Sequence, residues 1–109
     1  MFSHIVRSYH LVLLCALLLF SEVAQAQSLA QRKAAQRYEI DAKRLGVDVN
    51  GDDALPRSRE FKRIDSTYYV GWFFEGAYKF NHAADYLGFK NASVPLERAL
   101  ALMERDYRK

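Results

Sequence analysis

Apolar and polar positions divide the chain into a strongly apolar start and a longer amphipathic remainder. Leu11–Phe20 is an unbroken apolar run, with Arg7 before it and the small-x-small triplet Ala-Gln-Ala at 24–26 after it. A short apolar run followed by such a triplet is typical of a cleaved signal peptide. The run is shorter than the ~18 apolar residues of a membrane span. We therefore predict a signal peptide over residues 1–26, with an uncleaved anchor as the alternative.

The pattern next predicts an amphipathic helix over residues 27–46. Ser28 is a suitable cap for its first turn, and Gly46 is a typical residue for its end. Positions spaced by 4, 4 and 3 residues form a narrow apolar stripe, which consists of Ala34, Tyr38, Ala42 and Leu45. Alanine supplies half of this stripe, so the helix needs a partner surface to be well ordered.

We predict that residues 47–57 form a connector between helical segments. Positions 50–53 read Asn-Gly-Asp-Asp, which are turn-forming residues. Pro56 is expected to interrupt any helix before Arg57. The remaining helical part of the chain is therefore expected over residues 58–109.

Most aromatic residues lie between Phe61 and Phe89, which places the core there. Residues 66–74 have strand propensity, but their aromatic residues fall on both parities, so the alternation of a strand is missing. Helical spacing gives two adjacent apolar faces, one with Tyr69, Phe73, Ala77 and Phe80, the other with Tyr68, Trp72 and Gly76. A helix packed on two sides is the better interpretation, with Asp65 or Ser66 as its cap.

The last segment, 91–109, predicts a second helix of this domain. Ser93 is expected to cap it, and Pro95 is tolerated in a first turn. Its apolar face consists of Leu96, Ala99, Leu100 and Met103. Trp72 is expected to be buried against that face.

These residues carry a resemblance to tetratricopeptide repeats, here in an exported bacterial protein. Trp72 and Gly76 keep the tryptophan–glycine spacing of the first repeat helix, while Ala92 and Leu96 look like the second helix. The resemblance implies an all-α protein, in which the signal peptide and the amphipathic helix precede an antiparallel helical hairpin. Such repeats bind peptides or proteins on concave surfaces. One unit leaves apolar faces uncovered, which favours a partner or self-association.

Charge and candidate chemistry narrow the function further. The formal net charge is +3 with no long run of like charges, so no nucleic-acid partner is expected. Cys15 is the only cysteine and leaves with the signal peptide. His82, Glu75 and Asp85 are candidate metal ligands for a metal-assisted enzyme, but the sequence favours a polar turn. No nucleotide or hydrolase motif is present, so neither enzyme activity nor a cofactor is expected.

The sequence therefore predicts a periplasmic or secreted helical module for protein–protein interaction, without a membrane span once the signal is cleaved. The alternative is a small carbohydrate-binding domain of the cell envelope, in which Trp72 and its aromatic neighbours form a sugar platform. The predicted partner-binding residues are Tyr68, Phe73, Leu96 and Met103. Tyr38, in the first predicted helix, is a candidate to cover the surface that they form.

Overall fold

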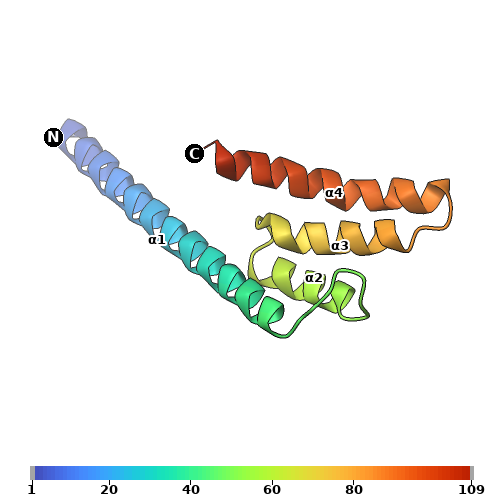
Figure 1. Cartoon of the computed structure of the whole chain (residues 1–109). Coiled ribbons are helices and arrows are strands. Elements are labelled where there is room, and N and C mark those ends of the chain that lie inside the picture. The colour runs from blue at the N-terminus through green and yellow to red at the C-terminus, as the bar shows by residue number, and fades with distance from the viewer. Residues whose placement is uncertain (1, 109) are drawn as a thin grey trace. The chain divides into compact units, whose positions relative to one another are not determined.

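The computed structural model describes residues 2–108, with side chains from Ser8 on, and all regular structure in this range is helical. The helices are α1 (Phe2–Arg44), α2 (Ala54–Ile64), α3 (Tyr69–Asn81) and α4 (Tyr86–Tyr107), as Figure 1 shows. The prediction of an all-α protein is confirmed, and the helical interpretation of the aromatic segment is correct over the strand alternative.

The chain forms two compact units, Met1–Ala30 and Gln31–Lys109. In the first unit, every described side chain is exposed. By length and composition, α1 contains a stretch apolar enough to cross a membrane, with a mean hydropathy of 1.7. This mean is carried by the unbroken run at 11–20, because the flanks of the run mix apolar residues with polar ones such as Ser21 and Glu22. The segment is compatible with a signal peptide and with a membrane anchor.

The predicted helix start at Ser28 is wrong, because Ser28 lies inside α1. No glycine or proline occurs between residues 20 and 30, so nothing there ends a helix. The predicted end is correct. Gly46 has a φ of 70°, Val47 N–H donates to the Ala42 carbonyl and Gly46 N–H to that of Lys43, both at 3.1 Å. This is the pattern of a glycine-terminated helix.

Helix α2 begins at Ala54, inside the segment 47–57 that was predicted as a connector. Pro56 lies in its first turn, where a missing backbone N–H removes no helical hydrogen bond. The expectation that Pro56 interrupts a helix is therefore wrong. The turn before α2 is held to the end of α3, where the Asn81 amide donates to Asn50 Oδ1.

Neither Asp65 nor Ser66 caps α3, which starts at Tyr69 after Tyr68 without a side-chain cap. Asp65 instead ends α2, and its N–H donates to the Phe61 carbonyl at 2.8 Å. Its carboxylate accepts hydrogen bonds from the backbone N–H and the hydroxyl of Thr67, at 2.9 and 2.6 Å. The sharp turn between α2 and α3 is closed by these bonds.

Helix α4 begins at Tyr86, five residues before the expected segment. Asp85 caps it by accepting a hydrogen bond from Gly88 N–H at 2.8 Å. Ser93 is no cap, because its hydroxyl donates to the Lys90 carbonyl within the helix. Pro95 lies inside α4 and is buried. The helix continues through this proline because tertiary packing offsets a lost backbone hydrogen bond.

In the second unit, α2 packs against α3 and α3 against α4. Phe61 of α2 is fully buried at the centre of the core. Its ring lies 4.7 Å from that of Tyr38 in α1 and 5.5 Å from that of Phe74 in α3, measured between centroids. Gly71 allows the close approach of α2, since a Cβ there would lie 2.8 Å from the Phe61 Cβ. Gly76 does the same for α4, where a Cβ would lie 2.5 Å from the Leu96 Cγ.

Candidate functional site

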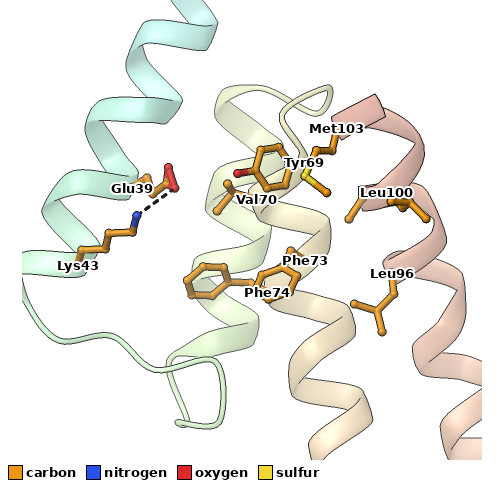
Figure 2. A pocket seen from close by; sticks show the side chains of 10 residues that line it. Glu39, Lys43, Tyr69, Val70, Phe73, Phe74, Leu96, Leu100 and Met103 are labelled. Carbon is orange, nitrogen blue, oxygen red and sulfur yellow. Dashed lines mark ion pairs between the residues drawn. The ribbon is translucent and has the colours of Figure 1, made fainter. Parts of the chain in front are cut away.

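An apolar groove lies on the side of α3 that α2 does not cover (Figure 2). In that view Leu96, Leu100 and Met103 of α4 point toward α3, which lines the groove with Tyr69, Val70, Phe73 and Phe74. The volume of the groove is about 440 Å³. An ion pair of α1 borders it and consists of Lys43 Nζ and the Glu39 carboxylate, 3.8 Å apart. The lining is therefore mostly hydrocarbon, with its charge confined to the α1 side.

The apolar surface continues beyond the groove toward the turn between α3 and α4. Leu96 and Leu100 also border a second hollow, which Phe80 and Phe89 share. The rings of Phe80 and Phe89 meet edge to face, with centroids 5.2 Å apart. We call the combined surface the α3–α4 face, and it consists of Phe73, Phe80, Phe89, Leu96, Leu100 and Met103.

Much of this face is open to solvent. Phe73 exposes 46% of its surface, Phe80 51% and Leu100 52%. Exposed phenylalanine costs hydration free energy, and contiguous apolar patches of several hundred Å² usually mark an interaction site. The α3–α4 face is therefore an apolar surface that the single chain leaves partly open.

Three of the four residues predicted to bind a partner lie together on this face. These are Phe73, Leu96 and Met103. Tyr68 does not join them, because it is buried in the core and its hydroxyl donates to a Glu39 carboxylate oxygen at 2.7 Å. Burial and this hydrogen bond raise the pKa of Tyr68. Sequence reasoning missed Phe80, Phe89 and Leu100 as site residues, although their helical spacing was visible.

The expected burial of Trp72 against Leu96, Leu100 and Met103 is wrong. Trp72 is half-buried on another side of α3, and its indole N–H donates to the Ser66 carbonyl at 2.9 Å. Lys62 Nζ lies 4.1 Å from the ring centroid, and the Arg98 guanidinium lies 5.9 Å from it. One residue of helix turns by about 100°, so Phe73 takes the place that was expected for Trp72.

Arg32 links three segments of the second unit. Its guanidinium lies 2.8 Å from a carboxylate oxygen of Asp65 and 2.8 Å from one of Asp106 in α4. It also donates to the carbonyl and the hydroxyl of Thr67, at 3.3 and 3.2 Å. Burial alone raises the pKa of Asp65, but hydrogen bonds from Thr67 and Arg32 outweigh it and hold this pKa below its ordinary value. The network fixes the α1 segment and the end of α4 to the α2–α3 turn.

The three candidate metal ligands point to different partners. Glu75 forms ion pairs with Lys62 and Lys79, at 3.2 and 3.5 Å. The His82 ring stacks on Tyr78, and its Nδ1 lies 2.9 Å from the Tyr78 carbonyl. Asp85 caps α4. Among the described side chains, no three of the residue types His, Cys, Asp and Glu gather as a metal site.

Comparison of the chain with protein families, with curated proteins and with solved structures gave no match. The resemblance to tetratricopeptide repeats therefore stays a prediction.

Proposed function

We propose that this chain is an exported helical module that binds a protein or peptide through the α3–α4 face and performs no catalysis. The observation that carries the proposal is the open apolar surface of Phe73, Phe80 and Leu100 beside a well-packed core. A soluble domain of this size gains stability by burying such side chains. Their exposure is best explained by a partner that covers them.

The geometry of the face suits a helical or extended peptide segment. A groove with aromatic and aliphatic walls accepts the apolar side of an amphipathic helix, which is a common mode of peptide recognition. The packing of consecutive helices at glycine positions supports the proposal of a tetratricopeptide-like hairpin over α3 and α4. Repeats of that kind bind partners in grooves between helices.

Export is part of the proposal and rests on the N-terminal segment. We propose cleavage after Ala26, which removes the exposed apolar part of α1 and leaves the residues that pack on Phe61, such as Ala35 and Tyr38. Intact-mass measurement of the exported protein tests this. A mass that starts at Gln27 is expected, whereas a chain that retains residues 1–26 shows an anchor instead.

The carbohydrate-binding alternative finds no matching observation. A sugar platform needs Trp72 exposed together with at least two aromatic neighbours. The faces of the Trp72 ring are instead approached by Lys62 and Arg98, and its N–H is occupied by Ser66. We therefore put forward protein binding alone.

Site-specific photo-crosslinking tests the proposed function. A photoreactive phenylalanine analogue replaces Leu100 on the face or, as the control, Ala101, which is exposed and about 100° further around α4. Cells that produce each full-length variant are irradiated, and the adducts are identified by mass. We expect a protein adduct at position 100 that position 101 does not give.

Equal adducts at both positions, adducts with lipid alone, or no adduct at position 100 would overturn the proposal. Because both positions are exposed, neither replacement is expected to change folding, and circular dichroism of each variant checks this.

A further inference from the structure

Exposed and half-buried side chains along one flank of α4 follow the spacing of a coiled-coil seam. From Phe89 to Tyr107 the spacings are 4, 3, 4, 3 and 4 residues, and the positions are Phe89, Ser93, Leu96, Leu100, Met103 and Tyr107. Alternating spacings of three and four place side chains in one stripe that packs against another helix. The buried residues Ala92, Ala99 and Leu102 belong to a different side of α4. The stripe therefore lies beside the packed side of α4: Phe89, Leu100 and Tyr107 remain exposed after folding, whereas Ser93, Leu96 and Met103 are half-buried.

We infer that the occupant of this stripe is the α4 helix of a second copy of this chain, packed antiparallel across a two-fold axis near residue 98. This inference rests on the proposed function and names its partner. The sequence of spacings is the same when read in either direction, and its centre lies at position 98. A two-fold interface requires a surface that is complementary to itself, which such a symmetric stripe provides.

Charges beside the stripe distinguish the antiparallel orientation from the parallel one. Lys90, Glu97 and Glu104 lie on its solvent side, all exposed, and none forms an ion pair within the described part of the chain. In an antiparallel pair, each Lys90 lies opposite the second copy's Glu104. A parallel pair places Lys90 beside Lys90 and Glu104 beside Glu104, which is unfavourable. In the antiparallel pair, Glu97 of one chain lies near Glu97 of the second chain, and this is the single like-charge contact among the three positions.

Exposed apolar area on and beside the stripe supplies much of what such a dimer needs. The aromatic side chains expose between 43% and 82% of their surface, and they are Phe73, Phe80, Phe89 and Tyr107. At about 150–250 Å² for each aromatic side chain, this exposure amounts to about 450 Å². A stable interface buries about 800 Å² on each partner. Leu100, which exposes 52% of its surface, adds to the aromatic area.

Cysteine cross-linking in the full-length chain tests the inference. Cys15→Ser removes the native thiol in every variant. Glu97→Cys is combined with a bis-maleimide that spans the ~10 Å between packed helices. In the antiparallel dimer, position 97 of one chain and position 97 of the second chain are offset by roughly 3 Å along the helix axis. A cross-linked dimer is therefore expected.

Glu104→Cys is the matched control, because it lies on the same side of α4, two turns away. Its own copy is ~20 Å distant along the axis, so Glu104→Cys alone is expected to give no dimer. The same holds for Lys90→Cys alone. A chain with Lys90→Cys and a chain with Glu104→Cys, produced together, are expected to cross-link to each other.

Each other outcome overturns the inference. Self-cross-linking of Lys90→Cys or Glu104→Cys shows a parallel pair. Failure of all cysteine pairs, while the photoreactive group at position 100 captures a different protein, removes the second copy as occupant and leaves the proposed function intact. Failure of the cysteine pairs and of the capture removes both.

Discussion

The two sides of α3 differ sharply in how their aromatic residues are used. Phe74 faces Phe61 and the core, together with Val70, while Phe73 lies next to it in the sequence and exposes nearly half of its surface. Both are phenylalanines in the same helix. The difference teaches that residues of α1 and α2 complete the core around Phe61, whereas the α3–α4 face is left partly open by the single chain.

The largest effect is expected from the core side. Phe61→Ala removes a fully buried ring and should lower the free energy of unfolding by about 3–5 kcal/mol. Phe73→Ala is the matched control on the open side and should cost about 1 kcal/mol or less at high dilution. Urea unfolding followed by circular dichroism measures both. Equal losses in the two variants would mean that the two sides do not differ as described.

A smaller loss is expected from Arg32→Ala. This change leaves the carboxylate of Asp65 with fewer hydrogen bonds and releases Asp106, so the free energy of unfolding should fall by about 1–3 kcal/mol. Lys33→Ala, at an exposed neighbouring position, should change it by ~0.5 kcal/mol or less. If both variants unfold at the same urea concentration, the network does not hold α1 to the core.

The pH dependence of stability sharpens the same point. The folded-state pKa of Asp65 is lowered, so its stabilising effect is complete above its unfolded pKa of about 3.9 and is lost as the pH falls further. As the pH falls, the Asp65 carboxylate is protonated in the unfolded chain before it is protonated in the folded chain, which favours unfolding. Urea midpoints between pH 3 and 6 should therefore fall at the acid end, and less steeply for Asp65→Asn than for the natural chain. Parallel curves for the two proteins would contradict the role of this carboxylate.

The sequence was sufficient for the helical class and for the end of α1, because both depend on local signals. Helical spacing of the aromatic residues indicated α3, and Gly46 indicated the end of α1. Helix starts were harder to place. Asp65 and Ser93 are residue types that commonly cap helices. The carboxylate of Asp65 is instead hydrogen-bonded to Thr67 and Arg32, and α4 begins before Ser93 because Asp85 caps it.

The position of Trp72 illustrates why the site was found only in part. Phe73 and Trp72 are both apolar and adjacent, and periodicity alone does not decide which of them faces α4. The close approaches at Gly71 and Gly76 fix the rotation of α3, and these depend on the other helices. By contrast, spacing alone placed Leu96, Leu100 and Met103 on one side of α4, although the predicted face also included the buried Ala99 and began too late to include Phe89.

The central claim is that the α3–α4 face is covered by a partner copy, and dilution tests it most directly. Thermal unfolding of the exported protein is followed over a hundredfold range of concentration, beside Leu100→Asp, which places a charge in the stripe. By mass action, the melting temperature of the natural protein should fall by several degrees on dilution, whereas that of Leu100→Asp should not change. A natural protein whose melting temperature stays constant over that range, and which sediments as a monomer throughout, would contradict the account.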